Sequence, residues 1–258
     1  EMVVATEELV VAGLTRTGAD FDYLAPHLAD HRLIRMDYRG RGRSDFDSNW
    51  RNYTLSVECR DVLELLAHLG LEQVALIGTS RGGLNAMALA MIAHDHLLGV
   101  ALNDVGPELD PKGVEFIMGY LGRNPAAKTY EEAAAAMARA FPEFHGVPES
   151  RWLEEVKRHY RATDDGLKIT YDPHLRDAVA AAGQQAVDLW PFFDALQGLP
   201  LVTIRGANST LFSRETLMQM QARRPDMIVA EVPDRGHVPF LDEPQALAAL
   251  HEWIGQIK

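Results

Sequence analysis

The chain has 258 residues, of which 47% are hydrophobic and 24% are charged, enough for one large α/β domain or a core with an insertion. Its formal net charge of −12 argues against a nucleic-acid partner, because the phosphate backbone requires clustered lysine and arginine. We therefore expect a small-molecule partner.

Cysteine content and hydropathy indicate the cellular compartment in which the protein is expected. The single cysteine, Cys59, excludes an internal disulfide and fits a reducing compartment. No apolar run reaches the roughly 18 residues of a membrane-spanning helix, and the start shows neither a signal-peptide pattern nor a Met. We expect a soluble cytoplasmic protein with no membrane association; the sequence does not define its oligomeric state.

The first 106 residues alternate between strand and helix patterns. Strands are predicted over 9–12, 32–36, 73–77 and 97–102. Helices are predicted between them, over 19–29, 54–69 and 83–93. Pro26 weakens the first helix, and Gly70 ends the second. This order predicts a mostly parallel sheet with right-handed crossovers.

The alternation stops at Gly106-Pro107 and returns near residue 191. Helical patterns fill most of the interval, including 130–140 and 150–160, with one short extended segment predicted over 166–171. Strands at 201–204 and 227–232 and helices at 214–222 and 243–257 complete the chain. We predict an α/β core of residues 1–106 and 191–258, with a helical cap, residues 107–190, over the carboxyl edge of the sheet.

The pentapeptide Gly78-Thr79-Ser80-Arg81-Gly82 stands between an apolar strand and a helix. In this context G-x-S-x-G predicts a nucleophile elbow, a turn so sharp that side chains at the flanking glycines would collide. Ser80 is then the nucleophile, and the Arg81 N–H can face a developing oxyanion. The alternative is a plain turn in which Ser80 caps the helix.

A second candidate, His237, follows the last predicted strand in Asp234-Arg-Gly-His237. Loops at the carboxyl ends of parallel strands open onto one crevice, so His237 can reach Ser80 although 157 residues separate them. We predict that His237 is the general base, rather than one of the surface histidines that a chain with ten must contain.

Together these motifs resemble the α/β-hydrolase family over residues 9–254. The elbow and Gly236-His237 match two of its motifs, and Asp37-Tyr-Arg-Gly-Arg-Gly-Arg-Ser44 resembles its Asp-x-Arg-Gly-x-Gly-x-Ser stretch. The resemblance implies an α/β-hydrolase fold with a cap. It also implies an oxyanion loop at Ala12–Arg16, where the Leu14 N–H would join that of Arg81.

The triad acid departs from the family pattern. Arg205-Gly-Ala-Asn-Ser-Thr210 resembles the family's Arg-Gly-x-x-Ser-Asp stretch, but Thr210 occupies the acid position. Three explanations remain open: Asp104 after the strand at 97–102 supplies the acid, the chain is a substituted variant, or it is a poor enzyme. We favour Asp104, whose alternative role is to hold backbone amides in its own loop; Asp234 is too close to His237 in sequence.

The start of the chain is the second departure. Family members usually have a hairpin before the first strand identified here. Residues 2–6 offer one strand, and Glu7-Glu8 lacks the Gly or Asn that a two-residue turn prefers.

Arginine and histidine offer further candidates. Arg16 is a candidate for binding a substrate carboxylate, although arginines in such loops also bridge neighbouring loops. His94 and His96 close a helix without a partner at ligand spacing, so we expect no metal. No cofactor is expected either.

These features predict a serine hydrolase that cleaves a small carboxylic ester or lactone, with Ser80 as nucleophile and His237 as base. The alternatives within the fold are carbon–carbon bond hydrolysis and perhydrolysis. From another class, Thr210 keeps open a weakly active or non-catalytic relative that binds a small ligand.

Overall fold

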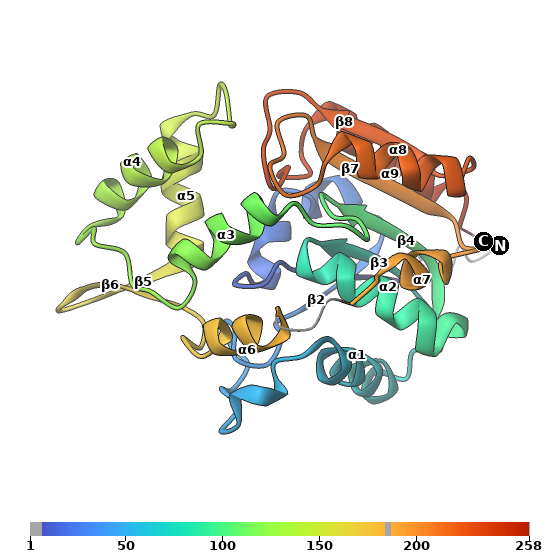
Figure 1. The fold of residues 1–258 in the computed structure, drawn as a ribbon, viewed down its shortest axis with the longest axis horizontal. Helices are drawn as coiled ribbons and strands as arrows, with labels where there is room; N and C mark the ends of the chain where they lie inside the picture. The colour runs from blue at the N-terminus through green and yellow to red at the C-terminus, as the bar shows by residue number, and fades with distance from the viewer. Residues whose placement is uncertain (1–6, 184–186, 258) are drawn as a thin grey trace.

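A parallel sheet forms the centre of the molecule (Figure 1). The structure is a computed structural model, and it describes residues 7–183 and 187–257. Within these ranges the sheet has six strands, in the spatial order β2 (Arg32–Met36), β1 (Glu7–Val11), β3 (Val74–Thr79), β4 (Leu97–Asn103), β7 (Leu201–Gly206) and β8 (Ile228–Val232). All neighbours are parallel, which confirms the predicted sheet.

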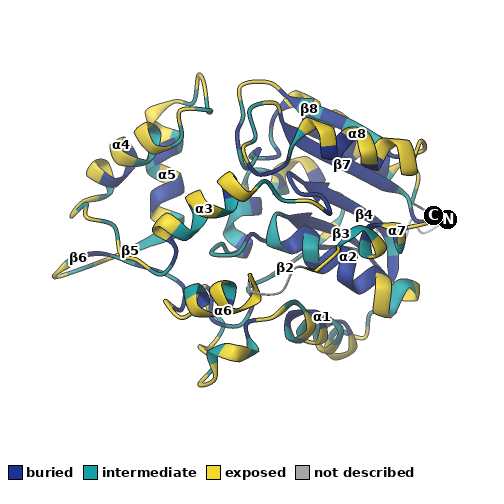
Figure 2. Ribbon diagram, viewed as in Figure 1, coloured by how far each residue is buried: buried dark blue, intermediate teal, exposed yellow. Residues whose placement is uncertain are grey.

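Helices cover both faces of this sheet. Successive side chains of a strand point to opposite faces, and because both sets are apolar here, both faces must be buried. In β1, Leu9 and Val11 pack on one side, whereas Val10 packs on the other. The first side holds α1 (Leu55–Leu69), α2 (Arg81–Ala93), α7 (Trp190–Asp194) and α8 (Arg214–Arg223). The second holds α9 (Pro244–Ile254) and two 3-10 helices, Gly18–Asp22 and Ala25–Leu28. Figure 2 shows the buried strands between exposed helical faces.

The segment from α3 to α6, between β4 and β7, lies apart from these layers, on the left in Figure 1. It consists of α3 (Pro111–Tyr120), α4 (Tyr130–Ala140), α5 (Glu149–His159), the antiparallel pair β5 (Tyr160–Thr163) and β6 (Gly166–Ile169), and α6 (Leu175–Ala182). Its helices α4 and α5 bury Ala133, Trp152 and Val156 in an apolar cluster of their own.

Several element boundaries differ from the prediction. The helix predicted over 19–29 is two 3-10 helices, the second of which starts around Pro26, whose ring does not fit a helix interior. The extended segment at 166–171 pairs with residues 160–163, so α5 ends at His159. The last helix ends at Ile254, after which i→i+3 bonds tighten the chain. The strand predicted over 2–6 lies outside the described residues.

Candidate active site

The serine of the elbow has an unusual backbone. Ser80 connects β3 directly to α2 with φ 50° and ψ −112°, a region that residues other than glycine rarely adopt. Its side chain makes no capping hydrogen bond to the helix, so the plain capping turn is not what forms here. A Cβ on Gly82 would lie 2.1 Å from Val11 O, and one on Gly78 would lie 2.5 Å from Gly82 O. Both glycines are therefore required by the tight turn.

Three predicted residues meet at the carboxyl ends of the strands. Ser80 Oγ is 3.0 Å from His237 Nε2, and His237 Nδ1 is 2.7 Å from Asp104 Oδ2. A carboxylate only accepts hydrogen bonds, so Nδ1 carries the proton that is donated to Asp104. The lone pair of Nε2 is then free to accept the Ser80 hydroxyl. In this arrangement the imidazole can take the serine proton.

Asp104 follows β4 and is fully buried, with φ 53°. Two donors, one at the end of β7 and one in the loop after it, hold its carboxylate: the Gly206 N–H donates to Oδ1 at 2.7 Å, and the Ser209 hydroxyl donates to Oδ2 at 2.6 Å. Sequence reasoning missed Ser209. The only signal was its place beside Thr210, in the stretch that resembles the acid loop of the family.

The other acid positions do not face the histidine. Thr210 is exposed and makes no side-chain hydrogen bond to His237. Asp234 lies outward, with Oδ1 3.1 Å from His145 Nδ1. Of the acid candidates weighed from the sequence, the structure brings Asp104 alone to the imidazole.

The two predicted oxyanion donors border the same serine. The Leu14 and Arg81 N–H groups donate no hydrogen bond within residues 7–183 and 187–257. The Leu14 carbonyl accepts from Arg41 Nε at 2.8 Å, which fixes the peptide that follows it. Neither amide is thus engaged by another group in the described chain, and Leu14 lines the same cavity as Ser80.

A buried ion cluster connects this loop to the elbow. Glu58 accepts from Arg81 Nε at 2.8 Å and lies 2.8 Å from Arg41 Nη2. Burial opposes ionisation of Glu58, but the two guanidinium groups outweigh it and lower the pKa of the carboxyl group. The cluster therefore ties the loop containing Leu14 to the first turn of α2.

Arg16, predicted to bind a substrate carboxylate, lines the cavity but is already paired with acids. Its Nε donates to Asp20 at 2.5 Å, and its Nη2 donates to Glu155 of α5 at 2.6 Å. Arg151 of α5 makes a second link, to Asp242 at 2.6 Å. These pairs fasten α5 to loops of the sheet, so Arg16 bridges two parts of the chain.

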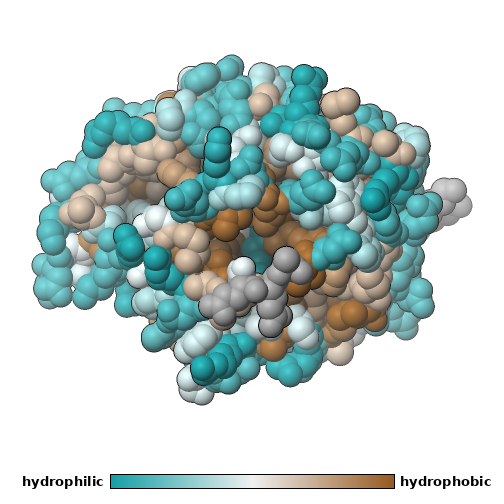
Figure 3. Space-filling model, in the orientation of Figure 1, coloured by the Kyte–Doolittle hydropathy of each residue, from teal (hydrophilic) through white to brown (hydrophobic). Residues whose placement is uncertain are grey.

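Ser80 and His237 line a cavity of about 670 Å³ between the sheet and the segment from α3 to β6. Most of its wall is apolar and comes from α3, α4, α5 and the loop after His237, with Phe116, Met137, Phe141, Phe144, Trp152 and Phe240 among the lining residues. Figure 3 shows hydrophobic side chains around a hollow between this segment and the sheet. A cavity of this size and lining suits a small, largely apolar ligand.

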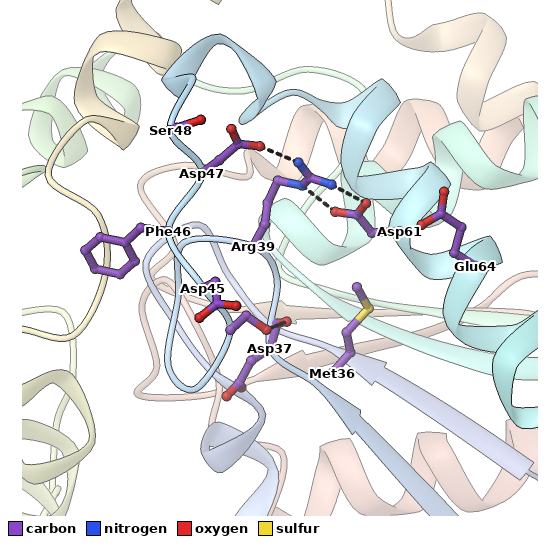
Figure 4. Close-up of a pocket in the computed structure, with 10 residues that line it drawn as sticks. Met36, Asp37, Arg39, Asp45, Phe46, Asp47, Ser48, Asp61 and Glu64 are labelled. Atoms are coloured by element: carbon purple, nitrogen blue, oxygen red, sulfur yellow. Dashed lines mark hydrogen bonds and ion pairs between the residues drawn. The ribbon is translucent and has the colours of Figure 1, made fainter.

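A second hollow, of about 540 Å³, shares no lining residue with the cavity. Figure 4 shows Arg39 between Asp47 and Asp61, and the guanidinium pairs with both carboxylates at 2.5 Å. These charges satisfy one another. The lining residues include Ser44 and Ser48 but no histidine that could act as a base for them, so this hollow has no part in the candidate site.

Two further features are absent from residues 7–183 and 187–257, a cluster of metal ligands and a membrane-spanning helix. No three His, Cys, Asp or Glu side chains there are grouped so as to hold a metal ion. His94 and His96 instead contact the carbonyl groups of Gln197 and Glu72. No helix in the same ranges has the length and apolar character needed to cross a bilayer.

The fold and these motifs agree with a family match. A family model described as the alpha/beta hydrolase fold matches residues 9–244, so the chain belongs to this family. An α/β hydrolase from Novosphingobium aromaticivorans, known from a crystal structure, superposes with a TM-score of 0.92 at 34% identity, covering 99% of this chain and 91% of the other.

Two curated relatives are named as hydrolases. The 3-hydroxybutyrate-oligomer hydrolase of Cupriavidus necator is 38% identical over 249 residues, covering 92% of this chain and 84% of the relative. The 2-(acetamidomethylene)succinate hydrolase of Mesorhizobium japonicum is 25% identical, covering 87% and 79%. Family membership and these relatives support a hydrolase.

Proposed function

We propose that this protein is a serine hydrolase that cleaves a small carboxylic ester or lactone, with residues 107–190 as a cap over the site. The contacts of His237 with Ser80 at 3.0 Å and Asp104 at 2.7 Å, at the wall of an apolar cavity, carry the proposal. The name of the Cupriavidus relative adds support, since 3-hydroxybutyrate units in an oligomer are joined by carboxylic ester bonds.

In the first half of the reaction, Ser80 Oγ attacks the acyl carbon while His237 Nε2 accepts its proton. The Leu14 and Arg81 N–H groups stabilise the oxyanion, and Asp104 stabilises the imidazolium. The tetrahedral intermediate collapses when His237 returns the proton to the leaving alkoxide. An acyl-enzyme on Ser80 remains.

In the second half, His237 takes a proton from water, which attacks the acyl carbon in turn. The apolar wall of the cavity limits the number of competing waters around the acyl group. The acyl–Oγ bond then breaks as His237 returns this proton to Ser80 Oγ, so that a carboxylic acid leaves and the serine hydroxyl is restored. The alternative of a non-catalytic relative was suggested by Thr210, and the contact between Asp104 and His237 favours the hydrolase over it.

Hydrolysis of p-nitrophenyl esters of increasing acyl length tests the proposal. The Ser80→Ala variant should lose at least about 10⁴-fold in kcat, as expected when the nucleophile of a triad is removed. Ser56→Ala is the matched control, because Ser56 is exposed on α1, away from the cavity, and should keep full activity. Activity of Ser80→Ala within tenfold of the parent would rule out the acyl-enzyme.

A further inference from the structure

Two arginines line the cavity, and their surroundings differ. Arg16 has two carboxylate partners, Asp20 and Glu155. Arg123 lies in the loop after α3, and no carboxylate oxygen lies within 4 Å of its guanidinium in residues 7–183 and 187–257. Since most other arginines near the sheet loops are paired with acids in a chain of net charge −12, this cation is an exception.

The loop that presents Arg123 is fixed on both sides. The Gly122 N–H donates to the Tyr171 hydroxyl at 3.1 Å, and Asn124 Oδ1 accepts from the Ile169 N–H at 3.1 Å. Gly122 has φ +74°, and a Cβ there would lie 2.7 Å from a backbone oxygen, so the turn is tightly specified. The backbone at Arg123 is therefore held beside the cavity, and its side chain is exposed there.

The rest of the cavity defines what such a cation can bind. Apart from the two arginines, the charged lining residues are Asp20 and Glu155, and both pair with Arg16. Arg123 is left as the unbalanced charge on a mainly apolar wall. The complementary ligand has an apolar body and one anionic end, and a planar carboxylate matches the two parallel N–H groups of a guanidinium.

We propose that Arg123 binds a free carboxylate of the substrate, so that the preferred esters are those of hydroxy acids or half-esters with an anionic end remote from the scissile bond. This inference rests on the proposed function, because it names the substrate class of the same site. Arg123 is a specificity residue here and takes no part in the chemical step.

The test compares two substrates that differ in one charge. They are the linear dimer of 3-hydroxybutyrate as the free acid and its methyl ester, with p-nitrophenyl butyrate as a neutral reference. A charge-assisted hydrogen bond to an exposed arginine should favour the acid by about tenfold in kcat/KM. Arg123→Met should remove this preference through KM, change the reference less than about twofold, and Arg123→Lys should restore part of it.

Arg139→Met is the matched control. It removes one positive charge from the exposed last turn of α4, and Arg139 does not line the cavity. The control should keep the preference for the acid. The inference is overturned if the parent enzyme cleaves acid and methyl ester equally well, if Arg123→Met weakens all three substrates alike, or if the control loses the preference too.

A binding experiment separates this inference from the proposed function. Calorimetry with Ser80→Ala should show tighter binding of the dimer acid than of its methyl ester, and adding Arg123→Met should abolish the difference. Absence of turnover in the parent with this binding pattern intact would refute ester hydrolysis and leave the carboxylate site standing. Turnover in the parent without the binding difference would refute the carboxylate site alone.

Discussion

Replacing Asp104 with Asn tests the assignment of the triad acid. Three donors converge on the Asp104 carboxylate: His237 Nδ1 at 2.7 Å and the Ser209 hydroxyl at 2.6 Å on Oδ2, and the Gly206 N–H at 2.7 Å on Oδ1. Asn has nearly the same shape but only one acceptor oxygen, and its NH₂ group must face at least one of these donors. Either His237 adopts the wrong tautomer, or the Gly206 amide loses its acceptor.

The expected loss follows from burial and charge. Asp104 is fully buried, so solvent cannot replace the missing negative charge beside the imidazolium. In serine proteases the same replacement lowers kcat by about 10⁴-fold. We expect a loss of about 10³–10⁴-fold for p-nitrophenyl butyrate, equal to about 4–5.5 kcal/mol in the activation free energy. The unpaired amide should also cost about 1–3 kcal/mol of folding stability.

The assay is initial-rate hydrolysis, run beside a urea unfolding curve so that loss of fold is not mistaken for loss of catalysis. Thr210→Asp alone should be nearly neutral, because the Thr210 side chain makes no contact with His237. Activity of Asp104→Asn above a tenth of the parent, in a folded enzyme, would refute the assignment. So would recovery of activity when Thr210→Asp is added to Asp104→Asn.

Two predictions concern stability. Gly82→Ala should lower the free energy of unfolding by about 1–3 kcal/mol, because the added Cβ would lie 2.1 Å from Val11 O. Gly119→Ala is the control and should leave the free energy of unfolding unchanged, because no atom lies within 4 Å of its added Cβ; equal urea midpoints for the two variants would contradict the prediction. Burial raises the pKa of Glu8, near His31, from 4.5 to about 7, so the folded state holds this proton to higher pH than the unfolded state and stability falls between those values. Glu8→Gln should therefore gain stability relative to the parent between pH 5 and pH 8 in urea titrations, and a pH-independent difference would refute the argument.

Local patterns were enough to predict most of the sheet and the elbow. β3, Ser80 and α2 are consecutive, and the collisions of a Cβ at Gly78 or Gly82 arise within the turn or with the adjacent strand. The meeting of Ser80 with His237 was predictable as well, because the carboxyl ends of parallel strands share one edge. These inferences needed only strand order and direction.

The remaining features depend on partners distant in sequence. The hydrogen bond of Ser209 to Asp104 spans 105 residues, and that of Arg16 to Glu155 spans 139. No local sequence pattern predicts either bond. In the sequence alone, Arg16 and Arg123 are both arginines in loops, and nothing near them distinguishes their roles. What distinguishes them is that α5 brings a carboxylate to the first and that, within the described chain, no acid reaches the second.

The position of the acid follows from the order of strands in the sheet. β4 and β7 are neighbours, with Asn103 opposite Ile204, and the Asp104 N–H donates to Ile204 O at 2.7 Å. A carboxylate after either strand can therefore reach the same imidazole without moving Ser80 or His237. In this chain the end of β7 and the loop after it supply two donors to Asp104, the Gly206 N–H and the Ser209 hydroxyl. On this argument Thr210 gives no reason to expect a weak enzyme, because the proposed acid, Asp104, follows the neighbouring strand.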